Sequence, residues 1–251
     1  MGRREQRLQR ERQEKRQKGA RSNKWVTALA ILLAIIGIVL IFSNQIRNMM
    51  LTHQITQQKP VTVSEIAENK KVEANFDYAD IHPISFETVL QASLANAKVP
   101  SIGEIAVPSV GIKLTIAKGV SDLNMLVGAG TLRADQEMGK GNYPLASHYT
   151  TAGDGKMLFT PLLNIQNGAK VYLTDLENVY EYEVYWHETV APERVELVDD
   201  TPDEDIVTLI TCADLEGLQR YVVRGRLKNK TSVKDAPQEA KDAFNLESRT
   251  F

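Results

Sequence analysis

The sequence predicts a mainly β fold, an antiparallel barrel or sandwich with short helices, preceded by one N-terminal transmembrane helix. Two observations support this prediction. Between residues 103 and 227, short runs rich in β-branched and aromatic residues alternate with turn signals such as Val110-Gly111 and Asn167-Gly168, a spacing typical of all-β domains. Ahead of them lies an apolar, uncharged run at residues 25–42, which is long enough for a membrane helix.

The amino-terminal segment has the composition of a membrane anchor. Residues 1–24 contain ten Lys and Arg against three Glu, and residues 25–42 carry no charge. A helix of that length spans roughly 27 Å, near the minimum for a bilayer core. A cleaved signal peptide would have a small-residue cleavage site, which the sequence after Phe42 fits poorly. We therefore predict a basic cytoplasmic segment at 1–24, an uncleaved anchor at 25–43 and, by the positive-inside rule, everything after Ser43 outside the cell.

Charge and cysteine content narrow the class of function. The first 24 residues carry +7, so the formal net charge of −2 leaves about −9 on the rest of the chain. An acidic outer domain argues against nucleic acid as a partner. Its single cysteine, Cys212, cannot form an internal disulfide and is a candidate reactive thiol. The domain must be stable through its core alone, for which about 150–170 residues suffice.

The chain between the anchor and the strands is polar and then helical. Residues 44–78 are rich in Gln, Lys and Glu and predict an extracellular stalk, with a helix over Val63–Asn69. Apolar residues recur with helical spacing from Ile84 to Ala97, which predicts a short amphipathic helix that ends before Pro100.

The β-rich part follows. Its predicted strands are Gly103–Val107, Ile112–Lys118, Tyr143–Tyr149, Lys170–Thr174, Val179–Thr189, Ile206–Cys212 and Tyr221–Leu227. Two short helices are predicted between them, at Asp122–Gly128 and Phe159–Ile165. Residues 231–251 form a polar, charged tail, which we expect to be frayed.

The run Ile206–Cys212 is the centre of the functional prediction. Alternation along this strand places Thr208, Ile210 and Cys212 on one face. A second strand begins at Arg220, after a plausible hairpin loop. If Cys212 pairs opposite Arg220, the two side chains are cross-strand neighbours roughly 5 Å apart at Cβ. Two interpretations stay open: a thiol activated by a guanidinium, or a buried cysteine that only packs.

Four histidines are available to serve the cysteine. His53 falls in the predicted stalk, His82 precedes a proline ahead of the strands, and His187 lies late in a long strand. Histidines in such places are commonly half-exposed surface residues. His148 ends an apolar run and is followed by a Gly-rich turn, so it is well placed for a cleft, although the spacing alone leaves an ordinary surface role open.

These residues together resemble a known family. The motif TLITC at 208–212, Arg220 eight residues after the cysteine, and ASHYT around His148 resemble class A sortases, the membrane-anchored cysteine transpeptidases of Gram-positive bacteria. The resemblance covers about residues 79–230, which are expected to form the catalytic domain. It implies a closed antiparallel eight-stranded β-barrel, cleavage of an LPxTG-type sorting signal between Thr and Gly, and transfer of the protein to an amine of the peptidoglycan precursor lipid II.

The resemblance and elementary chemistry assign the same roles. Cys212 is the nucleophile, and a neighbouring cation favours its thiolate. His148 protonates the leaving amine and deprotonates the incoming one, while Arg220 donates hydrogen bonds to the substrate backbone or the oxyanion. The residues expected to contact the sorting signal are Thr208, Ile210, Ala146, Val190, Ala191 and Pro192.

The acidic loop before the cysteine strand raises the question of calcium. Some relatives bind calcium through carboxylates from this loop and an earlier strand, and this loop contains Asp199, Asp200, Asp203, Glu204 and Asp205. The same acids are equally typical of a solvated loop. A full site is not evident, so we predict no metal and no other cofactor.

Two alternatives remain at this stage. A sortase of another class would keep the chemistry and change the substrate, as in pilin polymerisation, but class C relatives usually carry an N-terminal lid and a second, C-terminal membrane segment, which the polar tail lacks. A non-enzymatic membrane-tethered surface domain would need Cys212 to be buried and inert.

Overall fold

The computed structural model describes residues 2–56, 61–78, 84–95 and 99–245 of the 251-residue chain. His82 lies outside these residues. The chain divides into two compact units, Met1–Ile46 and Arg47–Phe251. The first consists largely of helix α1 (Arg3–Ile41) and the start of α2 (Ser43–Thr56).

Helix α1 contains a stretch that is long and apolar enough to cross a membrane. Lys24–Ile41 has a mean hydropathy of 2.5 over 18 residues. Its large apolar side chains, including Trp25, Leu33 and Ile41, are exposed rather than packed against protein. Exposed apolar surface of this extent is stable in lipid and not in water. The predicted single N-terminal membrane helix therefore has a counterpart in α1.

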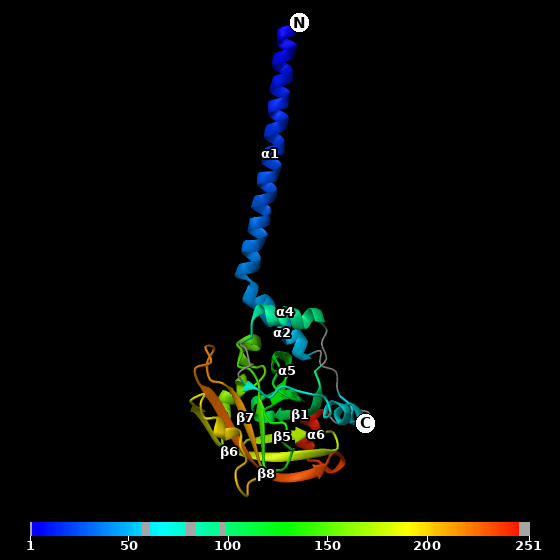
Figure 1. Cartoon of the computed structure of the whole chain (residues 1–251), viewed down its shortest axis with the longest axis vertical. Helices are drawn as coiled ribbons and strands as arrows, with labels where there is room; N and C mark the ends of the chain where they lie inside the picture. The colour runs from blue at the N-terminus through cyan, green and yellow to red at the C-terminus, as the bar shows by residue number, and fades with distance from the viewer. Residues whose placement is uncertain (1, 57–60, 79–83, 96–98, 246–251) are drawn as a thin grey trace. The chain divides into compact units, whose positions relative to one another are not determined.

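The second unit is built on a closed eight-stranded barrel (Figure 1). Its strands follow one another around the barrel in the order β1-β2-β3-β4-β7-β8-β6-β5. Their bounds are β1 Ser101–Val107, β2 Ile112–Ala117, β3 Ala129–Thr131, β4 Asn142–Ala146, β5 Lys170–Thr174, β6 Asn178–Val190, β7 Ile206–Cys212 and β8 Arg220–Ser232. The prediction of a closed eight-stranded barrel is confirmed.

The prediction of a wholly antiparallel barrel is wrong. β2 pairs with β3 in parallel, and β4 pairs with β7 in parallel. A parallel pair needs a crossover connection. Helix α5 (Asp122–Val127) supplies it between β2 and β3, and the long excursion through β5 and β6 supplies it between β4 and β7. This second parallel pair places two strand ends side by side, which matters for the site.

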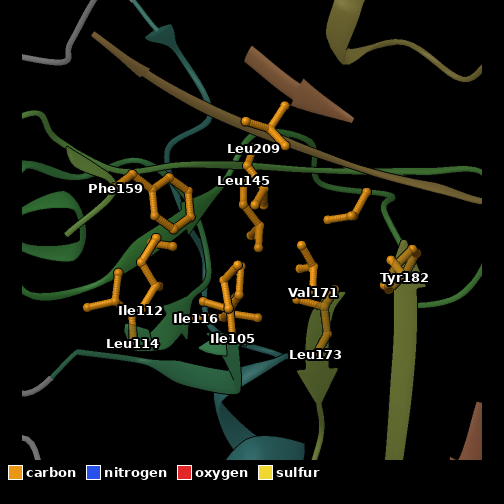
Figure 2. Packing of buried hydrophobic residues seen from close by; sticks show 14 of the residues in the cluster. Ile105, Ile112, Leu114, Ile116, Leu145, Phe159, Val171, Leu173, Tyr182 and Leu209 are labelled. Atoms are coloured by element: carbon orange, nitrogen blue, oxygen red, sulfur yellow. The ribbon is translucent and has the colours of Figure 1, made fainter. Parts of the chain in front are cut away.

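The barrel interior is filled by the inward-facing residues of each strand (Figure 2). Ile105, Leu145, Val171, Leu173 and Leu209 are each 0 % exposed. Alternation along the strands sends these side chains inward and their neighbours outward. Because the interior is closely packed, replacing one of these leucines by alanine would cost about 2–5 kcal/mol. The strands that carry the outward-facing residues are therefore held rigidly.

Short helices cover the barrel. One apolar cluster joins Leu51 of α2, Val89 of α4 (Phe86–Ala95) and Leu126 of α5. Single turns of 3-10 helix occupy the connections: η2 Pro108–Val110, η3 Ala152–Gly155, η4 Thr160–Asn164, η5 Val195–Val198 and η6 Val233–Asp235. The helix predicted near residues 84–97 corresponds to α4, which spans Phe86–Ala95 in the described part of the chain.

Two segments contribute to the core of the domain, although the sequence predicted that they lie outside it. Helix α3 (Val63–Asn69) forms where predicted, and its Ile66 is buried together with Phe244 of α6 (Gln238–Phe244) against Tyr172 of β5. Residues 63–69 therefore belong to the folded unit rather than to a stalk. The tail after residue 230 was expected to be frayed, and this expectation is wrong up to residue 245. Ala240 and Phe244 give α6 a buried apolar side.

Candidate active site

Three neighbouring strands bring the predicted catalytic residues to one level of the barrel. In the parallel β4–β7 pair, Ala146 is the register partner of Ile210. The backbone N–H of Ser147 continues this ladder by donating to the carbonyl oxygen of Ile210 at 3.1 Å. His148 and Cys212 each follow two residues later, so they stand at corresponding ends of adjacent strands.

The third residue comes from the antiparallel β7–β8 pair. Arg220 is the direct register partner of Cys212, which is the pairing that the sequence analysis considered. Val207 and Leu209 of β7 point into the barrel core, whereas Ile210 packs against residues outside it. Cys212 shares the outward face of Ile210 by alternation. The catalytic candidates therefore lie on the outer surface of the barrel, over a rigid wall.

A single pocket of about 350 Å³ contains His148, Cys212 and Arg220 in its lining. Its volume is in the range of a ligand site that holds part of a peptide. Five of the six residues predicted to contact substrate also line it: Ala146, Val190, Ala191, Pro192 and Ile210.

Thr208, the sixth, does not line the pocket. Its side chain is 0 % exposed and its Oγ1 donates a hydrogen bond to Asn142 Oδ1 at 2.7 Å. Alternation placed Thr208 correctly on the outer face. The turn η5 and the residues after it cover that part of the face, which the strand pattern cannot show.

The thiol of Cys212 is partly buried and free. Burial raises the pKa of Cys212 above its ordinary value, the Arg220 guanidinium lowers it, and the Asp214 carboxylate raises it. Desolvation is the largest of these effects because a thiolate loses more hydration than a thiol. The resting protein at neutral pH therefore holds Cys212 mainly as the thiol.

His148 is 7 % exposed. Its burial lowers the pKa of the imidazole from 6.5 to about 4, and the carboxylate of Asp122 in α5 opposes this shift. Asp122 stabilises the charged form because an opposite charge offsets part of the lost hydration. His148 is therefore neutral in the resting protein, and it can take up a proton when a negative charge develops beside it.

Arg220 is held by the loop that joins β7 to β8. Its Nη1 donates to the carbonyl oxygen of Gly217 at 2.7 Å and to that of Gln219 at 3.3 Å. Gly217 has φ +69 and sits close to both catalytic groups, since a Cβ added there would lie 3.8 Å from Arg220 Nη1 and from Cys212 Sγ. A glycine thus permits the tight turn and keeps the space beside the sulfur open.

The sequence did not identify several lining residues. Val195 and Val198, on η5, form one wall of the pocket, and Thr211, immediately before the cysteine, also lines it. Thr211 Oγ1 is buried and has no hydrogen-bond partner among the described residues.

The other described histidines do not line this pocket. His187 of β6 is hydrogen-bonded through Nδ1 to the Tyr221 hydroxyl at 2.8 Å. His53 is an exposed residue of α2. Of the histidines that the structure describes, His148 alone has a position from which it can act on Cys212.

The loop acids do not fit a calcium site. Asp200 forms an ion pair with Arg133 at 2.8 Å, Glu204 pairs with Arg226 at 2.9 Å, and Asp205 accepts the backbone N–H of Gly141 at 2.8 Å. These carboxylates are directed to three different partners instead of converging. Over the described parts of the chain, no group of three or more His, Cys, Asp and Glu side chains could hold a metal ion.

The arrangement has the parts required for acyl transfer from a peptide. It offers a thiol nucleophile, a neutral imidazole able to accept and return a proton, and a permanently charged donor beside the sulfur. The apolar walls supplied by Val190, Ala191, Pro192 and Ile210 suit an extended apolar segment.

Comparison with known proteins gives consistent matches. The Sortase domain family matches residues 105–228. Sortase A of Streptococcus agalactiae is 39% identical over 227 residues, which cover 88% of this chain and 91% of that protein. Sortase A of Listeria monocytogenes is 42% identical over 205 residues, or 80% and 90% of the two chains.

Solved structures agree with the fold. The structure of Listeria monocytogenes sortase A has a TM-score of 0.53 at 42% identity and covers 57% of this chain and 97% of its own. Sortase C-3 of Streptococcus pneumoniae has a TM-score of 0.54 at 16% identity, over 78% and 97% of the two chains. The second likeness concerns the fold alone.

Proposed function

The chain belongs to the sortase family of cysteine transpeptidases, and from this premise we propose that it cleaves an LPxTG-type sorting signal between Thr and Gly. The acyl group passes to Cys212 as a thioester and then to an amine of the peptidoglycan precursor lipid II, which anchors surface proteins to the cell wall. One observation carries the proposal: Cys212 and Arg220 are register partners and share one pocket with His148.

The first half-reaction follows from the protonation states. The thiol of Cys212 gives its proton to the imidazole of His148, and the resulting thiolate attacks the carbonyl carbon of the Thr in the sorting signal. As the C–S bond forms and the C–N bond breaks, protonated His148 donates its proton to the departing glycine amine. Because burial disfavours the imidazolium of His148, transfer of that proton to the leaving group is favourable.

The second half-reaction reverses these roles. An incoming amine attacks the thioester, neutral His148 accepts its proton, and a new amide forms as the Cys212 thiolate leaves. Amines attack thioesters readily, and microscopic reversibility requires the same residue to serve as acid and then as base. The acceptor amine must enter the pocket where the glycine amine left.

Arg220 supplies the charge that the tetrahedral intermediates need. Its guanidinium is always protonated and presents several donors in a fixed plane. In the resting structure Nη1 is bonded to two loop carbonyls, and its other N–H groups can reach a bound peptide or the oxyanion. One such donor typically contributes about 10²–10³ in rate.

The apolar walls account for the Leu-Pro part of the signal. Val190, Ala191 and Pro192 come from the end of β6 and the loop after it, and Ile210 lies on β7 ahead of Cys212. A peptide whose Thr carbonyl faces Cys212 would extend its apolar residues along these side chains. Ala146, next to Ile210 in register, leaves room on the adjoining strand.

We assign the anchor and its orientation on the same basis. The basic segment 1–24 stays in the cytoplasm, residues 25–43 span the plasma membrane, and residues 44–251 lie outside, with the catalytic machinery within 79–230. Ten basic residues before the apolar run support this orientation. The partners are then LPxTG-bearing surface proteins and the amine of lipid II.

The proposal is tested with the full chain in detergent. Peptides that carry LPxTG, a scrambled version of it, or the sorting signals of other sortase classes are offered together with amine acceptors. We expect cleavage between Thr and Gly and a new amide only with LPxTG peptides. Turnover of another signal alone would assign the chain to a different sortase class, and absence of any cleavage would favour a non-enzymatic surface domain.

A further inference from the structure

One wall of the pocket is held by polar side chains rather than by backbone pairing. The wall, which we define as residues 195–200, includes η5 and places Val195 and Val198 in the pocket lining. Asn142 of β4 donates from Nδ2 to the carbonyl oxygens of Leu197 at 3.0 Å and Asp199 at 2.9 Å. Arg224 of β8 donates from Nη2 to the same Leu197 oxygen at 2.8 Å.

Thr208 fixes the orientation of the Asn142 amide. Asn142 and Thr208 are 1 % and 0 % exposed, and Thr208 Oγ1 donates to Asn142 Oδ1 at 2.7 Å. The amide oxygen is thereby occupied, so both N–H donors of Asn142 face the wall. Without the hydroxyl, the buried amide oxygen would lack its donor, and the Asn142 amide would be held only by its two Nδ2 hydrogen bonds to the wall.

The far end of the wall is tied to the same strand. The Asp200 carboxylate accepts the backbone N–H of Asn142 at 2.8 Å and forms a forked ion pair with Arg133, at 2.8 Å and 3.2 Å. Arg133 is also bonded to Asp135. Planar, two-pronged Arg–carboxylate pairs are among the more specific polar contacts. The wall is therefore attached to β4 both at Leu197 and at Asp200.

Apolar packing links this wall to the substrate face. Val198 packs with Ala146 in one buried cluster, and Leu197 packs with Val190 in another. Ile210 contacts both clusters. A wall that shifted away from β4 would carry these side chains with it and would widen the groove beside the cysteine.

We propose that Thr208 and Asn142 are positioning residues: Thr208 orients the Asn142 amide, which holds the wall in its binding-ready position before the peptide arrives. This inference rests on the proposed function, in which that wall contacts the sorting signal. Because the wall is ordered beforehand, the peptide does not have to order it on binding. Loss of the Thr208 hydroxyl should therefore weaken peptide binding while leaving the chemical step intact.

The test compares Thr208→Val, Thr208→Ser and a matched control, Thr174→Val, in the full chain in detergent. Thr174 is also 0 % exposed and donates from Oγ1, to the Asn178 carbonyl at 2.7 Å, but it is absent from the pocket lining. Three quantities are measured: kcat and KM with one LPxTG peptide, amide hydrogen exchange of residues 195–200, and the melting temperature.

For Thr208→Val we expect KM to rise about five- to tenfold with kcat within about twofold, and exchange over 195–200 to accelerate by a similar factor. Thr208→Ser, which keeps the hydroxyl, should resemble the wild type. Thr174→Val should lower the melting temperature without changing KM or the exchange of the wall. Unchanged exchange in Thr208→Val, or an equal rise of KM in Thr174→Val, would overturn the proposal.

Two further arms keep the result decisive. If Thr208→Val does not fold, Asp200→Ala removes the tie at the surface end of the wall, and faster exchange over 195–200 with a raised KM supports the proposal while wild-type values oppose it. If the wild type cleaves no peptide, the proposed function fails. The exchange data then still decide whether Thr208 orders the wall.

Discussion

Cys212 in β7 and Arg220 in β8 are direct register partners, and Arg220 Nη1 lies 2.7 Å from the carbonyl oxygen of Gly217 in the loop that joins the two strands. The cation is thus held beside the sulfur by the hairpin itself. Its effect on the thiol is electrostatic and modest, because burial remains the larger influence on the Cys212 pKa. The main contribution expected from Arg220 is therefore to the bound substrate.

A substitution at Arg220 can separate the effect of its charge from the effect of its hydrogen-bond geometry. Arg220→Lys keeps the charge but loses the planar set of donors, so kcat/KM for an LPxTG peptide should fall about 10²–10³-fold. Arg226→Lys serves as the control, since Arg226 lies on the same strand and pairs with Glu204 away from the pocket. Near-wild-type activity of Arg220→Lys would contradict the hydrogen-bonding role.

The thiol's protonation can be followed by alkylation with a neutral reagent. The pKa of Cys212 is raised above its ordinary value, mainly by burial, so the labelling rate should still rise about tenfold per pH unit between pH 7 and pH 8. Arg220→Gln should slow labelling at a given pH, and Asp214→Asn should accelerate it. A rate that levels off below pH 8 would show that the thiolate is already formed at neutral pH.

Buried His148 should make the fold sensitive to acid. Its pKa is lowered from 6.5 to about 4 in the folded protein, so between these values the unfolded chain binds more protons. Stability therefore rises with pH across this window and is lost as the pH falls from 6.5 towards 4. Near pH 5 the loss from His148 should be on the order of 2 kcal/mol.

Urea unfolding of the wild type and His148→Asn in the same detergent measures this effect. The difference in unfolding free energy between them should change by that amount between pH 7 and pH 5. It should stay constant above pH 7, where the imidazole is neutral in both states. A difference that is independent of pH from 7 to 5 would show that His148 is not held in its neutral form.

Much of the barrel could be predicted from local patterns. β5 and β7 have the predicted bounds, because both are uninterrupted runs of strand-forming residues. β3 was missed, since three residues that include a glycine give no periodicity to detect. Parallel pairing of β4 with β7 was also missed, because strand direction depends on the path of the connecting chain rather than on the strand's own residues.

At the site, local sequence patterns predicted the chemically active residues better than they predicted which strand residues are buried beneath other elements. Strand alternation and spacing brought Cys212, His148 and Arg220 forward as candidates, and the family resemblance of their motifs then assigned their roles. Thr208 was assigned to the correct face, but its burial there could not be predicted, since η5 lies ten or more residues earlier in sequence and its packing over that face is tertiary. The buried side of α6 was similarly hidden within a polar segment.

The orientation of the anchor is open to a direct test. Protease added to intact protoplasts should digest the domain that follows Ser43 and leave the basic segment before Trp25 protected. Antibodies against a tag at each end would identify the surviving fragment. Full protection of the domain would reverse the proposed orientation, whereas digestion of both ends would argue against a membrane-spanning α1.

The central claim is that Cys212 carries the acyl group, and intact-mass measurement of the full chain tests it most directly. When an LPxTG peptide is mixed with the wild type without an amine acceptor, the protein should gain the mass of the peptide up to Thr, and hydroxylamine should release it. Cys212→Ala should fold normally, with a stability change on the order of 1 kcal/mol, and should show neither the adduct nor turnover. Cleavage of the peptide by folded Cys212→Ala, or an unaltered adduct on that variant, would contradict the account.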